Sequence, residues 1–283
     1  MDIILNVTVS IAITLLMAAG LYIVYGLMNV INMAHGELLT IGAYTVVILT
    51  ASGAPFWVGV VAGAAAAGVA GLCVEALVIR RLYSVGGLST LLATWGVAIV
   101  IQQLLRIVFG PSAQFVSAPV NGTSNVLGTS YSTYRLLFLG AAILVLAALT
   151  VAFTRTSWGL TIRATMDGAD KAEAVGINSR RVYMATFIVG SAVAGLTGAL
   201  IAPLASVTPL MGTQYVVQAF LVVMVGGVGS LYAPLAGAVL IGGLSSLMTT
   251  FLDATTAQVI VLAAVVVAIY FRPNGLVGTA DLR

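Results

Sequence analysis

The feature that most constrains this chain is the length of its charge-free stretches. Residues 182–252 contain no Asp, Glu, Lys or Arg. Six further stretches are equally free of charge: 3–36, 38–74, 82–105, 107–134, 136–154 and 254–271. A charge near the bilayer centre costs about 3 kcal/mol on insertion scales, and a helix that crosses the hydrocarbon needs about 20 apolar residues. The pattern therefore predicts a chain that crosses a membrane several times.

The composition excludes most other classes of protein. Apolar residues make up 61% of the 283 residues, and only 11 basic and 8 acidic side chains are present, where a soluble protein of this length would carry roughly 70 charges. This balance rules out a water-soluble globule, a disordered chain and a nucleic-acid binder. The single cysteine, Cys73, excludes a disulfide scaffold, and its apolar surroundings favour a small buried side chain over a reactive thiol.

The charge-free stretches divide at their Pro, Gly and polar clusters into nine candidate spans. These are 4–28, 34–51, 57–79, 89–109, 135–154, 184–204, 214–229, 234–252 and 256–271. We therefore expect an all-α fold: a polytopic transmembrane helix bundle of about 8–10 spans with interrupted or re-entrant elements. Residues 1–283 form one transmembrane domain in this interpretation, with a cytoplasmic loop at 155–182.

The basic residues indicate the orientation, because Lys and Arg favour short cytoplasmic loops. Nine crossings with the C-terminus inside leave only Arg106 and Arg135 outside. The basic residues then placed inside are Arg80, Arg81, Arg155, Arg163, Lys171, Arg180, Arg181, Arg272 and Arg283. The N-terminus is expected outside. Its start, Met1-Asp2-Ile3, lacks the basic region of a cleavable signal, so the first span is expected to remain as a membrane helix.

Small residues recur every four positions in two of the candidate spans. One set is Gly59, Gly63, Ala67 and Gly71, and the other is Gly190, Ala194 and Gly198. A stripe of this kind lets two helix backbones approach closely inside a membrane, although Gly and Ala are also simply common in membrane helices. We expect these stripes to contribute to a compact bundle.

The densest charge lies between Arg155 and Arg181 and predicts a structured cytoplasmic segment. Asp167 can cap a short helix over 168–175, and Gly176 can end it in a left-handed conformation. Ala169, Ala172 and Val175 would form its apolar face, while Asp170, Lys171 and Glu173 would stay in water. Such a helix suits docking into a groove of another protein. The alternative is an ordinary solvated loop helix whose basic residues set the topology.

Polar residues enter the membrane region between Tyr25 and Tyr44. Asn29, Asn32, Gly36 and Thr40 would share one face of a helix, with Glu37 and Tyr44 beside them. Such groups must face the bundle interior or a water-filled path, unless neighbouring helices satisfy them and Glu37 lies at a helix end. His35 is interpreted as a packing residue, and no metal is expected because no second His or Cys lies at ligand spacing.

Glycines interrupt a second apolar run at 226–238. Gly226, Gly227 and Gly229, with Ser230 and a proline, break or kink a helix, and such breaks often line a path. No Lys follows these glycines in a phosphate-loop arrangement, so no ATP site is expected in the chain. No cofactor is expected either.

Four segments together resemble the LivH/LivM-type permeases of bacterial ABC importers, and the LivH-like member is the more similar. They are GLMNVINMAHGELLTIGAY at 26–44, GLTIRATMDGADKAEAVGINSRRV at 159–182 running into AGLTGAL at 194–200, GGVGSLYAPLAGA at 226–238, and FRPNGLVG at 271–278. A small departure is Tyr232-Ala233, where a glycine is more usual before the proline.

The resemblance implies a permease subunit, not an enzyme, of an ATP-driven importer for branched-chain or other hydrophobic amino acids. Urea and short-chain amides are alternative solutes. It further implies a bacterial inner-membrane location, a second homologous permease, two ATPase subunits and a periplasmic solute-binding protein. The expected translocation path includes Asn29, Asn32, Glu37, Thr40, Tyr44, Gly226, Gly227, Gly229 and Ser230. The expected ATPase-coupling residues are Arg163, Asp167, Asp170, Lys171, Glu173, Gly176 and Asn178.

The competing interpretation is an ion-coupled secondary transporter or channel, which needs carboxylates at mid-membrane. Glu37 and Glu75 are the only acidic residues near spans, and Glu75 precedes Arg80 closely enough to lie at the inner interface. An enzyme is the weakest interpretation, because one His and one Cys cannot assemble a nucleophile, a base and an orienting group.

Overall fold

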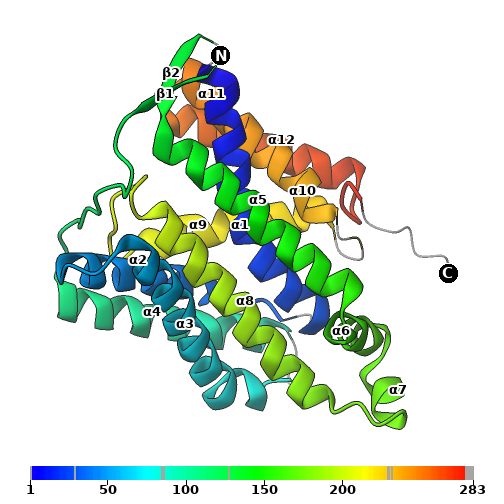
Figure 1. The fold of residues 1–283 in the computed structure, drawn as a ribbon. Helices are drawn as coiled ribbons and strands as arrows, with labels where there is room; N and C mark the ends of the chain where they lie inside the picture. Colours follow the sequence, from blue (N-terminus) through cyan, green and yellow to red (C-terminus); the bar gives the residue numbers. More distant parts are fainter. Residues whose placement is uncertain are drawn as a thin grey trace. The chain divides into compact units, whose positions relative to one another are not determined.

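A computed structural model gives the fold (Figure 1) and describes residues 2–28, 30–83, 87–126, 128–227, 230 and 232–277. The helices are α1 (Asp2–Met28), α2 (His35–Ala51), α3 (Phe56–Leu77), α4 (Gly87–Phe109), α5 (Thr133–Arg155), α6 (Ser157–Asp167), α7 (Ala169–Ala174), α8 (Ser179–Ile201), α9 (Met211–Gly226), α10 (Ala233–Ala238), α11 (Leu244–Phe251) and α12 (Ala254–Phe271). A 3₁₀ turn, η1 (Ile79–Arg81), follows α3, and a π-helical turn, η2 (Val239–Gly243), joins α10 to α11. The strands are β1 (Thr123–Val126) and β2 (Thr129–Ser132).

The predicted all-α polytopic bundle is confirmed. Seven helical segments within the described residues are long and apolar enough to cross a membrane, and α2 and α9 are shorter apolar helices of 17 and 16 residues. These nine elements correspond to the nine candidate spans. The antiparallel hairpin β1–β2, paired from Thr123 with Ser132 to Val126 with Thr129, was not expected. Its four-residue strands are too short to give a periodic hydrophobic signal.

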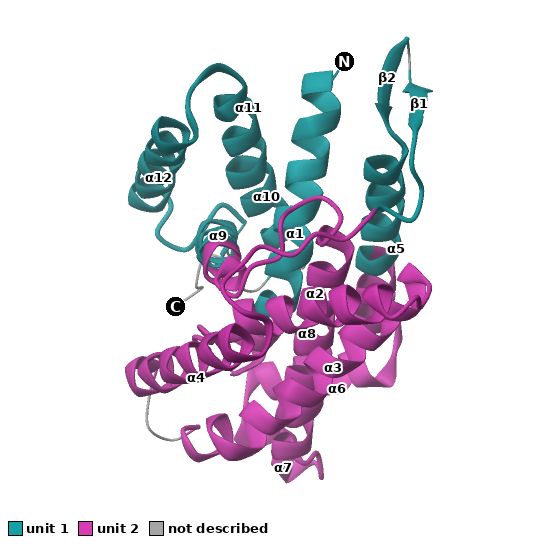
Figure 2. Ribbon diagram, turned by 90° about the vertical axis from the view of Figure 1, so that its left-hand side faces the viewer, with its two compact units in different colours: residues 1–22, 118–146, 217–283 teal, residues 23–117, 147–216 magenta. Residues whose placement is uncertain are grey.

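The chain forms two compact units, which Figure 2 distinguishes by colour. Unit 1, the first unit, contains residues 1–22, 118–146 and 217–283. Unit 2, the second unit, contains residues 23–117 and 147–216. Helices α1, α5 and α9 each contribute to both units. The single domain expected over residues 1–283 stays a prediction.

Helix α4 has the inverted polarity of a helix that faces lipid. Its buried residues are Thr90, Thr94 and Ala98, which follow one another at intervals of four on one face. The large side chains on its other faces are exposed, among them Leu88, Leu92, Trp95, Ile99, Val100, Leu104, Ile107 and Val108. A soluble protein rarely exposes so large an apolar surface. The arrangement therefore matches lipid outside and polar contacts inside.

Helices α2, α3 and α8 form the best-packed part of the second unit, and glycines bring their backbones together. A Cβ built on Gly42 of α2 would overlap the backbone of Gly195 of α8. A Cβ on Gly63 of α3 would lie 2.8 Å from the carbonyl oxygen of Gly42. Only residues without side chains allow this approach, which replaces the hydrophobic driving force that is missing in lipid.

The predicted small-residue stripes lie at these contacts, with one difference. On α3, Gly59, Gly63, Ala67 and Gly71 are buried as expected. On α8, however, Ser191 and Gly195 make the contact with α3, and neither belongs to the predicted stripe. Gly198, which does belong to it, lies against the carbonyl oxygen of Leu39 in α2, because α8 packs against α2 and α3 at once.

In unit 1, polar contacts of α1 help to hold the elements together. The Asn6 side-chain oxygen accepts a hydrogen bond from the Tyr131 hydroxyl at 2.9 Å and another from Arg135 at 2.6 Å, which ties the hairpin and α5 to the start of α1. Gly242 in the π-helical turn lies against α1, where a Cβ would be 2.8 Å from the Thr14 hydroxyl.

Replacing Gly195 with Ala should destabilise the α2–α3–α8 packing. The new methyl would overlap Ala67 and approach the carbonyl oxygen of Gly63 at 2.7 Å, and overpacking of this kind costs about 1–3 kcal/mol. The matched control is Gly96→Ala in α4, where a Cβ meets nothing within 4 Å and helix propensity improves by up to about 1 kcal/mol. Thermal unfolding of both variants in detergent tests this, and equal melting temperatures would contradict it.

Candidate functional site

The polar segment between α1 and α2 is not a single helix, which corrects one expectation. Helix α1 ends at Met28 and α2 begins at His35, so Asn32 does not share a helical face with Gly36 and Thr40. The Asn32 side chain accepts a hydrogen bond from the Ala34 amide at 3.1 Å, and its carbonyl accepts one from the His35 amide at 3.3 Å. This local turn competes with helix formation. Asn29 lies outside the described residues.

Thr94 of α4 satisfies the broken backbone between α1 and α2. Its hydroxyl oxygen accepts a hydrogen bond from the Met33 amide at 3.1 Å and lies 3.2 Å from the Ile31 carbonyl, to which the hydroxyl can donate. Non-helical backbone in a membrane protein requires such partners because lipid offers none. The break is therefore held by a side chain that faces the interior of the unit.

Glu37, in the first turn of α2, is the centre of the candidate site. Its side chain is buried, with the residue 1% exposed, and its Oε1 accepts a hydrogen bond from the Gln102 amide of α4 at 2.8 Å. The same amide nitrogen donates to the hydroxyl of Thr213, in the first turn of α9, at 2.9 Å. Three helices thus contribute to one polar cluster, consisting of Glu37, Gln102 and Thr213. We call it the Glu37 cluster.

The other two path candidates of α2 extend from this cluster. The Thr40 hydroxyl donates to the Gly36 carbonyl at 3.1 Å, and Tyr44 stacks on Phe109 with ring centroids 4.4 Å apart. Within the described residues, neither Glu37 Oε2 nor the Tyr44 hydroxyl has a hydrogen-bond partner. Buried polar atoms of this kind call for an explanation, such as water or a passing solute.

Sequence reasoning did not identify Gln102 or Thr213. A signal for Gln102 exists, because Thr90, Thr94, Ala98 and Gln102 are spaced by four in an otherwise apolar helix. That spacing places three polar side chains on one face. Thr213 carries no comparable signal, since it reaches the cluster only because α9 packs beside α2 at the glycine pair Gly36 and Gly212.

The second group of path candidates, Gly226, Gly227, Gly229 and Ser230, belongs to unit 1. Gly226 ends α9, and Gly227 follows with a φ of +88°. The Ser230 carbonyl accepts a hydrogen bond from the Tyr22 hydroxyl at 2.7 Å. Gly229 lies outside the described residues.

The chain's last described residues close over this glycine turn. The Leu276 amide donates to the Val225 carbonyl at 2.7 Å, and the Val277 amide donates to the Gly226 carbonyl at 3.1 Å. A Cβ on Gly275 would overlap Gly227. Residues 275–277 of the terminal motif are therefore in contact with residues 225–227, where the glycine motif begins.

The charged segment after α5 contains two helices rather than one, and Asp167 does not cap the second. Asp167 is the last residue of α6, Gly168 is the N-cap of α7, and this cap makes no side-chain hydrogen bond. Gly168 connects the two helices and has an extended conformation, with a φ of 162°. Helix α7 therefore begins at Ala169, one residue later than expected. The expected end of α7 at Gly176 is confirmed by its φ of +88°.

The expected apolar face of α7 is confirmed for two of its three residues. Ala172 is buried and Ala169 is half-buried, but Val175 lies beyond the helix and is 77% exposed. Two of the coupling candidates have structural contacts: Arg163 donates to the Phe153 carbonyl, and the Asn178 side chain accepts from the Arg181 amide at 3.0 Å. The residues that remain exposed are Asp167, Asp170, Lys171, Glu173 and Gly176.

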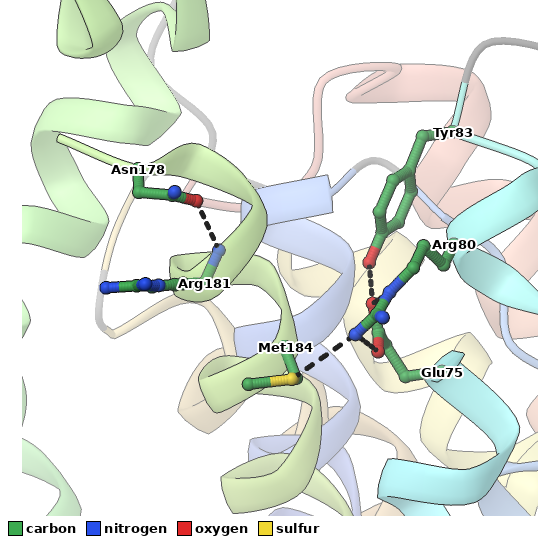
Figure 3. Close-up of polar contacts among 6 residues, drawn as sticks. All are labelled: Glu75, Arg80, Tyr83, Asn178, Arg181 and Met184. Carbon is green, nitrogen blue, oxygen red and sulfur yellow. Dashed lines mark hydrogen bonds and ion pairs between the residues drawn. The ribbon is translucent and has the colours of Figure 1, made fainter.

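Glu75 lies in the last turn of α3 and forms a separate buried cluster (Figure 3). Arg80 binds its carboxylate through two nitrogens, at 3.2 and 2.8 Å, and the Tyr83 hydroxyl donates to it at 2.7 Å. Burial, together with this bond to a carboxylate, raises the pKa of Tyr83. A carboxylate held in this way is a structural ion pair, so Glu75 does not resemble a free ion-coupling group.

Replacing Gln102 with Leu should destabilise the Glu37 cluster. The buried Glu37 carboxyl would lose its amide donor, and an unsatisfied buried polar group costs about 1–3 kcal/mol. The control is Gln103→Leu, because Gln103 is exposed on the same helix. Melting temperatures in detergent check this. Equal losses in the two variants would contradict the importance of the Glu37 cluster.

Comparison with known proteins places these features in a family. The family model described as "Branched-chain amino acid transport system / permease component" matches residues 3–270. The chain is 26% identical to the high-affinity branched-chain amino acid transport system permease protein LivH of Escherichia coli K12, covering 95% of this chain and 92% of that protein.

Two further relatives are similar over most of the chain. The permease protein BraD of Pseudomonas aeruginosa is 25% identical, with 95% of this chain and 92% of BraD covered. LivM of Escherichia coli K12 is also 25% identical, with 93% of this chain and 67% of LivM covered. The lower coverage of LivM agrees with the expected greater similarity to LivH. With its apolar helices and this match, the chain is a multi-pass membrane protein that belongs to the permease-component family of branched-chain amino acid transport systems.

Proposed function

We propose that this chain is one permease subunit of an ATP-driven importer that carries branched-chain or other hydrophobic amino acids into the cytoplasm. The observation that carries the proposal is the family match over residues 3–270. The names of the LivH and BraD relatives support this solute class. Most of the buried polar side chains among the described residues are neutral Thr, Ser and Asn, which suits a solute without net charge.

The proposed path includes the Glu37 cluster with Asn32, Thr40 and Tyr44 in one unit, and Gly226, Gly227 and Ser230 in the other. Asn29 and Gly229 stay in the proposal on sequence grounds alone. Glu37 Oε2 can accept a hydrogen bond, and the Tyr44 hydroxyl can donate or accept one. A zwitterionic amino acid carries an ammonium group and a carboxylate, so it can use both kinds of atom in passing.

The proposed partners follow from the importer architecture. A second, LivM-like permease would complete the path, a periplasmic protein would deliver the solute, and two ATPases would supply the energy. The exposed charges around α7, at Asp167, Asp170, Lys171 and Glu173, support docking of an ATPase on this segment. Arg163 and Asn178 would contribute indirectly, by holding α6 to α5 and by capping α8.

The proposed orientation places the N-terminus outside and the C-terminus in the cytoplasm of a bacterial inner membrane. Its support is the excess of Lys and Arg in the loops near Arg80, in the 155–181 segment and after α12, with only Arg106 and Arg135 on the other side. This orientation puts α6 and α7 where an ATPase can reach them.

Uptake of radiolabelled leucine should depend on ATP and should not depend on the proton gradient. The assay uses proteoliposomes that contain this chain with its ATPases, second permease and binding protein, and ATP and the gradient are varied independently. Uptake that follows the gradient without ATP would instead support the ion-coupled alternative, in which Glu37 carries the proton. Urea or a short amide that is taken up in place of leucine would replace the proposed solute while keeping the ATP-driven mechanism.

Replacing Gly176 with Val should weaken ATPase docking. A β-branched residue in the left-handed region costs about 1 kcal/mol or more, so the end of α7 would be remodelled. The control is Ala174→Val, at an exposed position with ordinary helical geometry. Co-purification of the ATPase is measured for both variants. Full retention by Gly176→Val would remove α7 from the coupling proposal.

A further inference from the structure

A groove of about 590 Å³ lies between the end of α3 and the start of α8, within one compact unit. None of the expected path residues contributes to it. Its lining residues are Ala76, Arg80, Arg81, Tyr83, Ala169, Glu173, Ser179, Arg180 and Tyr183. Arg80 is paired with the buried Glu75, so Arg81 and Arg180 face the single lining carboxylate of Glu173, and the groove has a positive balance. Its chemistry therefore favours an anionic ligand.

The groove is held in shape by the Glu75 cluster beneath it. Arg80 is fixed by its two bonds to Glu75, while Arg81 and Arg180 are exposed. Tyr83 and Tyr183 pack against each other with ring centroids 5.2 Å apart. Within the described part of the chain, Arg81 and Arg180 are thus the two lining arginines without a carboxylate partner, whereas Arg80 is neutralised by Glu75. Tyrosine and arginine at a helix end are typical of the membrane–water interface.

An apolar furrow of about 250 Å³ continues along the same two helices. It is lined by Ala64, Ala65, Gly68, Val69 and Leu72 of α3 and by Ile188 and Ala192 of α8. Leu72 precedes Ala76 of the groove by four residues, which is one turn on the same face of α3. The furrow and the groove therefore lie in succession along one helix pair.

The position of the groove indicates its depth in the membrane. The membrane-spanning segment that contains α3 ends at Arg81, and the one that contains α8 begins at Ser179. The groove is therefore at the polar ends of two spans, and the furrow lies inside their apolar lengths. By the proposed orientation, this end is cytoplasmic.

We propose that the groove and furrow form a binding site for one anionic phospholipid. The headgroup phosphate binds Arg81 and Arg180, and an acyl chain lies in the furrow over Gly68. Charge complementarity selects an anionic headgroup, and the furrow requires an attached chain. A soluble ATPase fits less well, because the furrow lies within the membrane-spanning length of α3 and α8, where a water-soluble partner does not reach.

The test uses the full chain in nanodiscs of phosphatidylcholine that contain a minority of phosphatidylglycerol, with bound lipid counted by native mass spectrometry. Arg180→Gln should lower the preference for phosphatidylglycerol about fivefold, and Arg81→Gln similarly. The matched control is Arg181→Gln, because Arg181 does not line the groove and its side chain points away from Arg80 and Tyr83 (Figure 3). It should change the preference much less.

A second arm tests the acyl chain. Gly68→Leu should fill the furrow and reduce phosphatidylglycerol retention, since a Cβ there meets Ala192 and Ile188 only at the ordinary contact distances of 3.5 and 3.7 Å. If Arg180→Gln and Arg181→Gln lowered the preference for phosphatidylglycerol equally, general surface charge would explain the binding, and the proposal would be overturned. Displacement of the lipid by excess inorganic phosphate, with no effect of Gly68→Leu, would assign a free-anion site and overturn it too. If Arg180→Gln retained as much phosphatidylglycerol as the unchanged chain, the lipid proposal would be overturned, and the groove would be a candidate site for a protein partner instead.

Discussion

Close approach of glycine backbones is the interaction on which one unit of this permease depends. Gly42 of α2 meets Gly195 of α8, Gly63 of α3 meets Gly42, and Gly36 meets Gly212 at the start of α9. Lipid tails are as apolar as leucine, so burial of large side chains would add little to helix association. The small residues bring α2 deep among its neighbours, and that depth places Glu37 within reach of Gln102 and Thr213.

The same absence of water explains how polar groups are arranged elsewhere. The break before α2 is satisfied by Asn32 and Thr94, and the Glu75 carboxylate is satisfied by Arg80 and Tyr83. The Glu75 carboxylate has partners for both of its oxygens. The Glu37 cluster differs from it, because one carboxylate oxygen of Glu37, like the Asn32 side-chain nitrogen, has no partner within the described residues. That difference makes Glu37 a better candidate for contact with a solute than Glu75.

The charged segment after α5 combines rigid attachment with exposed charge. Arg163 attaches α6 to the end of α5, Asn178 caps the start of α8, and the exposed charges between them surround α7. These bonds fix the elements on either side of α7, and the Ser179 hydroxyl at the start of α8 donates to the Ala169 carbonyl of α7 at 3.4 Å. The exposed charges of α7 support the proposed coupling with an ATPase.

Sequence alone determined the membrane class, the nine apolar elements and the family, because insertion into lipid depends on local composition and the motifs are contiguous. It also predicted Glu37 and the left-handed Gly176. Only the tertiary structure decided that Asn32 forms a turn, that α6 and α7 are separate, and that Gln102 joins Glu37 across 65 residues of sequence. Thr213 joins them from 111 residues beyond Gln102. Which residues become partners depends on which helix faces pack together. In this unit, glycine contacts between helices far apart in the chain determine that packing.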